Sequence, residues 1–390
     1  MDKNFLLKES KSFCILPWIH IHTSPVGKIY PCCISRLEME KDTLKDAFHS
    51  KEMNQLRYDM LNDIQNPVCN SCYKMDNFLQ TSRVHHNNIF SHKFDEVVPF
   101  TKSDGSLDEM KLSYFDVRFS NICNMKCRMC FSDYSSQWAK EENRVILNDD
   151  NKFLPEILEQ INNLELVYFA GGEPLITEQH YVVLEELIRA KKDVPLIYST
   201  NASMLKFKSK DLFDLWKHFS NIQLRVSMDH YGKKAEYIRH GTHWDTIESN
   251  ILKFKYYDNI DLNILTVVSI YNYSDLPKIH NYIVEKELLK INTNWQLYNL
   301  ENPKYLNILA LTKTLKDSAN LSIKKHCDGL DQQKFQHIIN QMMNSVNYSN
   351  SGELYSNYKD EFAREIKRLD KIRNENFEST FPELMGMLNE

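Results

Sequence analysis

Six short apolar runs with helical patterns between them constrain the fold of residues 111–300 more than any other feature of the sequence. The runs, each typical of a β-strand, cover residues 114–120, 164–171, 194–200, 222–228, 262–270 and 292–300. Amphipathic segments such as QHYVVLEELIRAKK and WDTIESNILKFKYY lie between them. Repeated right-handed βα units place such strands in a parallel sheet. The sequence therefore predicts an α/β fold, open or partly closed as a barrel, with ligands at the carboxyl ends of the strands.

Length, composition and charge narrow the class of protein. A chain of 390 residues with 42% hydrophobic and 26% charged residues is ordinary for a globular protein. A formal net charge of -5 supplies no basic field for a nucleic-acid backbone, so we expect no nucleic-acid partner. No stretch reaches the roughly 18 to 20 apolar residues that cross a bilayer, and the N-terminus has no signal-peptide pattern. We expect a cytoplasmic protein with no membrane partner.

The cysteines cluster in a way that favours metal over disulfides in a reducing compartment. Cys123, Cys127 and Cys130 follow the first predicted strand directly, at the edge where parallel sheets bind ligands. A structural zinc site needs four protein ligands, and no fourth cysteine or histidine lies near this loop in the sequence. A [4Fe–4S] cube also takes four ligands. Three cysteines on four irons therefore leave one iron open to a small molecule.

The C-x-x-x-C-x-x-C loop after the first strand of a βα array resembles that of radical S-adenosylmethionine (radical SAM) enzymes. In that family the methionyl amine and carboxylate of SAM chelate the open iron. The resemblance implies a [4Fe–4S] cluster on Cys123, Cys127 and Cys130 in a partial (β/α)6 parallel barrel. It also implies that SAM is cleaved reductively to a 5′-deoxyadenosyl radical, which abstracts hydrogen from a substrate.

Motifs at the ends of later strands extend this resemblance. FAGGEPL resembles the glycine-glycine-glutamate motif that receives the methionyl amino group, where glycines permit a close backbone approach. STNAS and VSMDH stand where family members contact the ribose and methionyl parts, and the arginine of YIRHG resembles the one that pairs with the SAM carboxylate. Met129 replaces an aromatic residue found in many members, and its thioether can still pack against a purine. The implied SAM-binding residues are Gly171, Gly172, Glu173, Thr200, Asn201, Ser227, Asp229 and Arg239.

A second cysteine set lies near the N-terminus. Cys14, Gly27 and Cys32 have the spacing of the C-x(9–15)-G-x4-C opening of SPASM and twitch domains, and Cys69 and Cys72 form their C-x-x-C clip. The resemblance implies an auxiliary [4Fe–4S] cluster on these four cysteines. With four cysteines bound, the cluster is full, which favours electron transfer. The family usually has this module after the barrel, whereas here it precedes the barrel.

Two questions about this set stay open at the level of sequence. Cys33 could replace Cys32 as a ligand, because strand alternation sends adjacent side chains to opposite faces and only one of them is expected to face the metal. The glycine spacing favours Cys32. A four-cysteine zinc site built from the same residues is the alternative to a cluster.

Several other residues that could do chemistry have simpler interpretations. His20 and His22 share a face of a predicted hairpin, and we expect exposed strand histidines without a metal role. His85 and His86 fall in a region where we expect solvated side chains. Cys327 stands alone in KKHCDGL and is expected to be a buried, inert thiol.

These patterns predict four segments and a class of reaction. The segments are a cysteine-rich α+β domain of twitch or SPASM type over 1–90, a linker over 91–110, the radical SAM core over 111–300 and a helical C-terminal extension over 301–390. The resemblance implies SAM and a reductase or a flavodoxin- or ferredoxin-type electron donor as partners. Family frequency favours a peptide or protein substrate, with a carbohydrate or other small molecule as the runner-up.

Two further functions stay open. A glycyl-radical activase would use the same cluster on a partner enzyme. A non-catalytic zinc-binding interaction protein belongs to a different class, and it leaves the GGEP, STN and SMD strand ends unexplained.

Overall fold

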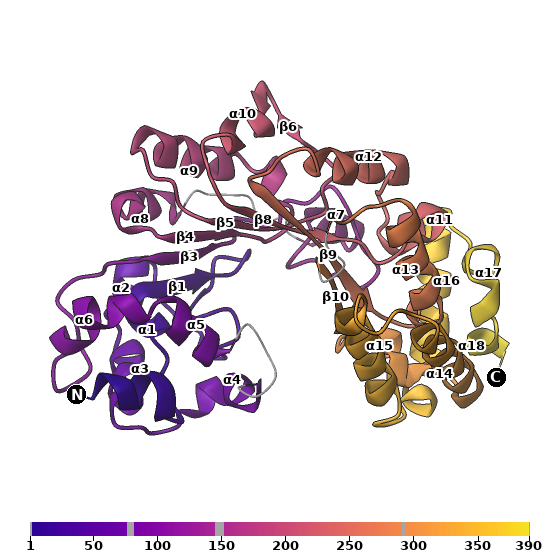
Figure 1. The fold of residues 1–390 in the computed structure, drawn as a ribbon, viewed down its shortest axis with the longest axis horizontal. Helices are drawn as coiled ribbons and strands as arrows, with labels where there is room; N and C mark the ends of the chain where they lie inside the picture. The colour runs from indigo at the N-terminus through magenta and orange to yellow at the C-terminus, as the bar shows by residue number, and fades with distance from the viewer. Residues whose placement is uncertain (1, 76–81, 145–151, 291–293, 390) are drawn as a thin grey trace. The chain divides into compact units, whose positions relative to one another are not determined.

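The computed structural model describes residues 2–75, 82–144, 152–290 and 294–389, which form two compact units (Figure 1). Residues 292 and 293 of the last predicted strand lie outside the described residues. Unit 1 comprises Met1–Cys123, Ser132–Tyr198 and Phe207–Ile222. Unit 2 comprises Asn124–Phe131, Ser199–Lys206 and Gln223–Glu390. The three-cysteine loop thus contributes Cys123 to unit 1 and its other two cysteines to unit 2.

The strands of unit 1 run in the order β5-β4-β3-β1-β2. They are β1 (His20–Thr23), β2 (Ile29–Tyr30), β3 (Tyr114–Val117), β4 (Leu166–Phe169) and β5 (Leu196–Thr200), the last two residues of which belong to unit 2. β3 pairs in parallel with β4, and β4 pairs in parallel with β5. β1 pairs with β3 in parallel and with β2 in antiparallel, so it is an interior strand of this sheet. All four residues of β1 are buried.

Helices cover the strands of unit 1, and Figure 1 shows α1, α3 and α5 clustered beside β1. The helices are α1 (Leu16–Ile19), α2 (Leu44–Phe48), α3 (Lys51–Leu61), α4 (Asn70–Met75), α5 (Arg83–Ile89), α6 (Phe94–Val97), α7 (Ser136–Glu141), α8 (Leu154–Glu159), α9 (Glu178–Arg189) and α10 (Leu212–Trp216). The shorter helices are η1 (Phe5–Glu9), η2 (Pro67–Cys69), η3 (Ser91–Lys93), η4 (Val98–Phe100), η5 (Ile161–Asn163) and η6 (Pro174–Ile176). Two short strands, β6 (Lys206–Phe207) and β7 (Lys210–Asp211), precede α10.

Capping explains why the helical pattern over residues 44–64 forms two helices rather than one. The Thr43 hydroxyl accepts a hydrogen bond of 3.0 Å from the backbone N–H of Asp46 and begins α2. The Ser50 hydroxyl accepts one of 3.2 Å from the backbone N–H of Met53 and begins α3. Serine and threonine satisfy free backbone donors at helix starts, so Ser50 restarts the helix after a short break.

The segment predicted as a linker, 91–110, is not extended throughout, since η3, α6 and η4 lie within it. Phe94 and Val98 on these turns are buried. Gly105 has φ +82°, and a Cβ there would lie 2.0 Å from the backbone oxygen of Asn54. Glycine is therefore required where this segment packs on α3.

Unit 2 has the strand order β10-β9-β8, with β8 (Ile222–Ser227), β9 (Ile260–Val268) and β10 (Trp295–Asn299). The first residue of β8 belongs to unit 1. β9 and β10 are parallel, with Trp295 opposite Ile264. The helices between and after them are α11 (Gly232–Ile238), α12 (Trp244–Phe254), η7 (Tyr273–Asp275) and α13 (Leu276–Glu285). Val226, Ile264 and Trp295 belong to the core of this unit.

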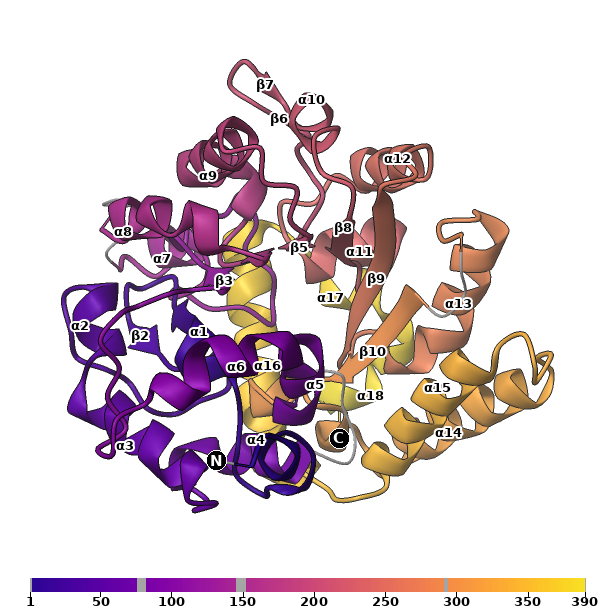
Figure 2. The same ribbon diagram turned by 60° about the vertical axis from the view of Figure 1, so that its left-hand side comes forward.

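The C-terminal segment is helical, as predicted, and Figure 2 shows α14 and α15 side by side. Its elements are η9 (Lys304–Leu306), η10 (Ile308–Ala310), α14 (Lys313–Asp328), α15 (Gln336–Ser349), α16 (Tyr355–Arg373), α17 (Phe377–Thr380), η11 (Pro382–Leu384) and α18 (Gly386–Asn389). Cys327 on α14 is buried, with its thiol 3.8 Å from the sulfur of Met342, as expected for an inert thiol.

The predicted α/β class with mostly parallel strands is confirmed, and each of the six predicted strands overlaps an observed one. The hairpin predicted near the N-terminus is also present as β1 and β2. The boundaries of the four predicted segments stay predictions. Over the part of the chain that the structure describes, no helix has the length and apolar character that a membrane crossing requires.

Candidate functional site

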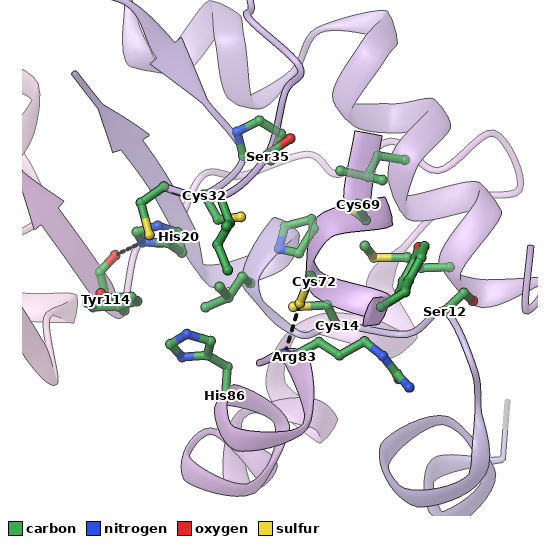
Figure 3. A pocket seen from close by; sticks show the side chains of 18 residues that line it. Ser12, Cys14, His20, Cys32, Ser35, Cys69, Cys72, Arg83, His86 and Tyr114 are labelled. Atoms are coloured by element: carbon green, nitrogen blue, oxygen red, sulfur yellow. Dashed lines mark hydrogen bonds between the residues drawn. The ribbon is translucent and has the colours of Figure 1, made fainter. Parts of the chain in front are cut away.

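The five N-terminal cysteines of unit 1 line one cavity of about 40 Å³ (Figure 3). They come from separate elements, and the loop before α1, the loop after β2, η2 and α4 all contribute. One buried water needs roughly 10–15 Å³ of such space, so the cavity holds a larger group than a single water. The thiols at its wall are those of Cys14, Cys32, Cys33, Cys69 and Cys72.

Backbone N–H groups face several of these thiols. The N–H of Arg83 donates a hydrogen bond of 3.2 Å to the sulfur of Cys72. The N–H of Leu16 faces the Cys14 thiol, and those of two residues after Cys33 face the Cys32 thiol. Such donors stabilise sulfur in its anionic form and are common around iron–sulfur clusters.

Burial is the largest influence on these thiols, and their mutual repulsion adds to it. Together they raise the pKa of Cys14 well above its usual value, and burial raises the pKa of Cys32 to about 12 and that of Cys69 to about 11. Thiols with such pKa values keep their protons near neutral pH. A metal that binds them as thiolates therefore displaces protons as it enters.

The electrostatic neighbours of the adjacent pair Cys32 and Cys33 differ. Cys32 interacts with Cys69, Cys72 and Cys14, whereas Cys33 interacts first with Asp116 on β3, then with Cys32 and with Arg118 beyond β3. This arrangement supports Cys32 as the fourth member of the thiol set, in line with the glycine spacing.

The donor set fits an iron–sulfur cluster. The thiols of Cys14, Cys32, Cys69 and Cys72 stand with that of Cys33 around a cavity, and thiolates are the usual ligands of a [4Fe–4S] cube.

The prediction that the strand histidines are exposed is wrong. His20 and His22 are only 1% and 4% exposed, since the His20 ring stacks on that of Tyr114 and the Nδ1 of His22 lies 3.0 Å from the Asp116 carboxylate. The Nδ1 of His20 donates to the carbonyl oxygen of Tyr114 at 3.0 Å, and its ring lines the thiol cavity. Burial lowers the pKa of His20 to about 4, so this imidazole is neutral at physiological pH.

His86 also departs from the expected solvated state. It lies on α5 with its ring at the wall of the same cavity, as Figure 3 shows. Its Nδ1 is buried with no hydrogen-bond partner within the described residues. Burial lowers the pKa of His86 to about 3, so a second neutral imidazole faces the thiols.

In unit 1 the glycine-glycine-glutamate motif lies against the chain that leads into Cys123. The N–H of Gly172 donates to the carbonyl of Ser120 at 3.2 Å, and the N–H of Glu173 donates to the carbonyl of Ile122 at 2.8 Å. The Glu173 carboxylate is 1% exposed and caps η6 through the N–H of Leu175 at 3.1 Å. The predicted motif and the first predicted cluster ligand are therefore brought together.

Both glycines of this motif are needed for the close approach. A Cβ on Gly172 would lie 2.2 Å from the backbone oxygen of Ile122, far inside van der Waals contact. Gly171 has φ +127°, a conformation that residues with a Cβ rarely adopt.

In unit 2 the other two loop cysteines lie with Arg239 and Asp229. The Nη1 of Arg239 is 3.7 Å from the sulfur of Cys127, and its Nε donates to the Oδ2 of Asp229 at 2.6 Å. Burial, with repulsion from Cys127, raises the pKa of Cys130 to about 12, and Arg239 opposes this rise.

The strand end at STN is bound to the start of the cysteine loop within unit 2. Thr200 accepts from the N–H of Ala202 at 3.0 Å, and the Nδ2 of Asn201 donates to the Oδ1 of Asn124 at 3.0 Å. Both residues are buried, while Ser227 at the end of β8 is half-buried. The structure thus brings Asn201 to Asn124, and it brings Arg239 both to Asp229 and to Cys127.

Sequence reasoning missed a buried ion network around Arg128, which stands between two loop cysteines. Its guanidinium is fully buried and pairs with Asp370 at 2.6 Å and Glu375 at 2.5 Å. It also lies 3.6 Å above the ring of Tyr237. An arginine inside the loop hints at a partner, but nothing local indicates carboxylates more than 240 residues away.

Comparison with known proteins identifies two regions of the chain. Residues 117–283 match the family model of the radical SAM superfamily, and residues 14–73 match that of an iron–sulfur cluster-binding domain, SPASM. These ranges contain the cysteine loop and the cavity cysteines, in the order predicted. They confirm the predicted cofactor set of SAM and iron–sulfur clusters, including an auxiliary one.

Curated relatives match over part of their length. GTP 3',8-cyclase of Campylobacter lari is 27% identical over 101 residues, which is 26% of this chain and 31% of that protein. The enzyme of the same name from Aliarcobacter butzleri is 29% identical over 29% of this chain and 35% of that protein. The one from Campylobacter jejuni subsp. doylei is 26% identical over 43% of this chain and 50% of that protein. The chain thus spans no more than half the length of these relatives.

Solved structures show distant likenesses. Native anSMEcpe with bound AdoMet is 20% identical, with a TM-score of 0.39 over 55% of this chain and 61% of that chain. Streptococcus suis SuiB bound to S-adenosylmethionine is 14% identical, with a TM-score of 0.40 over 75% of this chain and 65% of that chain. The chain thus contains a region, residues 117–283, that matches the radical SAM superfamily, and it is preceded by a region, residues 14–73, that matches the SPASM iron–sulfur cluster-binding domain.

Proposed function

We propose that this chain is a radical SAM enzyme with one auxiliary cluster, in which Cys123, Cys127 and Cys130 hold the [4Fe–4S] cluster that binds SAM. When bound, this cluster and SAM supply a 5′-deoxyadenosyl radical that abstracts hydrogen from a substrate. The observation that carries the proposal is the cavity lined by five thiols, four of which interact mutually, in a chain that also has a matched radical SAM domain.

The chain's own residues bind and orient SAM in this proposal. The Gly171 and Gly172 backbone and the Glu173 carboxylate receive the methionyl amine, which the tight packing of Gly172 and the burial of Glu173 support. Arg239 serves the methionyl carboxylate as a charge-assisted donor. The remaining contacts, to the ribose and methionyl parts, belong to Thr200, Asn201, Ser227 and Asp229.

The auxiliary cluster takes Cys14, Cys32, Cys69 and Cys72 as ligands. Since four thiolates fill its irons, its role is to transfer an electron rather than to bind substrate. A reductase, flavodoxin or ferredoxin in the cytoplasm is the proposed source of the electron for the SAM cluster.

Metal analysis tests this assignment. Iron and acid-labile sulfide are measured per chain after anaerobic reconstitution, in wild type and in a Cys123→Ala/Cys127→Ala/Cys130→Ala variant. We expect about eight irons falling to about four, as for two cysteine-bound [4Fe–4S] clusters. Four irons in wild type and none in the variant would mean that the N-terminal cysteines bind zinc. Stoichiometric zinc without iron in wild type would overturn the proposal that the chain is a radical SAM enzyme.

For the substrate we propose a peptide or protein, on the frequency of such substrates among radical SAM enzymes with auxiliary-cluster modules. A small molecule is the second candidate, because the curated relatives carry the name GTP 3',8-cyclase.

Hydrogen transfer can identify the substrate class directly. Fractions of a perdeuterated cell extract, with and without protease digestion, and GTP alone are incubated with the reduced enzyme and SAM. Deuterium in 5′-deoxyadenosine marks a fraction that holds substrate. A deuterium signal abolished by protease supports a peptide or protein, whereas a protease-resistant signal or turnover with GTP supports the small molecule. A stable radical left on a partner protein, seen by electron paramagnetic resonance, would indicate a glycyl-radical activase.

A further inference from the structure

The contact between Arg239 and Cys127 follows from a local backbone register. Within unit 2 the N–H of Lys126 donates to the carbonyl of His240 at 2.9 Å, and the N–H of Arg128 donates to the carbonyl of Ile238 at 2.8 Å. These two bonds flank Cys127 on one segment and Arg239 on the other. Each of the two residues is therefore held opposite the other by hydrogen bonds on both sides.

Gly241 permits this approach of the two segments. A Cβ there would lie 2.9 Å from the backbone oxygen of Asn124 and 3.3 Å from the Cα of Met125, and its φ is +100°. A larger residue would push the segment that carries Arg239 away from the cysteine loop.

Asp229 fixes the guanidinium from the other side. Its side chain is fully buried, its Oδ2 accepts from the Nε of Arg239 at 2.6 Å, and its Oδ1 accepts from the N–H of Val267 at 2.8 Å. With Nε held in this way, the Nη1 of Arg239 lies 3.7 Å from the Cys127 sulfur. The planar fork of arginine presents both donors at once, which a lysine could not do.

The charges agree with this geometry. An arginine side chain stays charged in proteins, and the Asp229 carboxylate lies beside its Nε. A permanent cation thus faces the sulfur of a cluster ligand.

We propose that Arg239 donates a charge-assisted hydrogen bond to the Cys127 thiolate and thereby raises the reduction potential of the SAM cluster, with Asp229 as the positioning residue. The inference rests on the proposed function and adds to the SAM-carboxylate role of Arg239. Cluster potentials depend on hydrogen bonds to sulfur and on nearby charge. A cation beside the thiolate favours the reduced cluster, which is the more negative state.

A redox titration without SAM separates the two roles of Arg239. The potential of the SAM cluster is followed by electron paramagnetic resonance in the full chain, after the auxiliary signal has been recorded in the Cys123→Ala/Cys127→Ala/Cys130→Ala variant. For Arg239→Met we expect at least a tenfold lower reduced-to-oxidised ratio at a fixed potential, which is about 59 mV more negative for one electron. Arg225→Met, which removes a cation that pairs with Gln223 on β8, is the matched control and should leave the potential unchanged.

The potential of Arg239→Gln is measured in parallel, because glutamine keeps a hydrogen-bond donor for Asp229. This variant tests the inference if Arg239→Met does not bind iron. A negative shift in either variant that retains the cluster supports the inference. If a variant has the wild-type potential in the absence of SAM but binds SAM more weakly, Arg239 acts on SAM alone. That result would overturn the inference. A wild-type chain with no iron on the loop would instead overturn the proposed function itself.

Discussion

Replacing Arg128 by methionine should lower the local stability of the C-terminal part of unit 2. The guanidinium is fully buried, and its removal leaves Asp370 and Glu375 without their shared cation. Breaking a buried ion pair by removing one partner costs about 3–5 kcal/mol. Both carboxylates keep another partner, since the Tyr237 hydroxyl donates to Asp370 at 2.7 Å and His240 lies 2.7 Å from Glu375. We therefore expect Arg128→Met to lose about 3 kcal/mol of local stability, at the low end of that range.

Hydrogen exchange can measure this loss locally, which matters because a chain of two units need not unfold in one step. Amides of α16 and of residues 237–240 should exchange roughly 100-fold faster in Arg128→Met than in wild type, since 1.4 kcal/mol corresponds to a factor of ten. Amides of β3 and β4 in unit 1 serve as the internal control and should not change.

A double variant tests the physical reason. Arg128→Met combined with Asp370→Leu removes both a cation and a carboxylate, so less charge is left unpaired than in the single variant. The double variant should therefore lose less than the sum of the two single losses. Strictly additive losses, or an acceleration in Arg128→Met below about tenfold, would refute the assigned role of the ion network.

Three other changes test the remaining sites. Gly172→Ala should abolish SAM binding, measured by equilibrium dialysis, because its Cβ would lie 2.2 Å from a backbone oxygen. Gly232→Ala is the control: its Cβ would meet open space, so the variant should keep SAM binding and lose only the stability that its left-handed backbone costs. Cys32→Ser should remove the auxiliary cluster's iron while Cys33→Ser retains it, and the reverse result in iron analysis would reassign the ligand. Burial lowers the pKa of His180 to about 3. The unfolded chain therefore binds this proton first as pH falls below about 6.5, so this group should lower stability by about 1.6 kcal/mol between pH 6.5 and 5. His20 and His86 act in the same direction, so His180→Phe should reduce the slope in urea unfolding by the share of His180 alone, and an unchanged slope would contradict the assignment.

The predictions that the structure and the domain matches confirmed depend on local pattern. Strand and helix positions follow from periodicity within a dozen residues, and the cysteine loop and the C-x-x-C clip follow from spacing alone. The resemblance of FAGGEPL to the glycine-glycine-glutamate motif indicated Gly171 and Gly172, and the structure supplies the physical reason, a backbone approach that leaves no room for a Cβ.

Long-range contacts decided the rest. β1 is an interior strand only because β3, some ninety residues later, pairs with it, and this buries His20 beside the thiols. The partners of Arg128 lie 242 and 247 residues away. The Cys127–Arg239 register depends on backbone bonds between segments 112 residues apart. A sequence by itself determines local propensity and ligand spacing, but burial and charge pairing depend on which distant segment comes to lie against a side chain, and only the folded chain sets that.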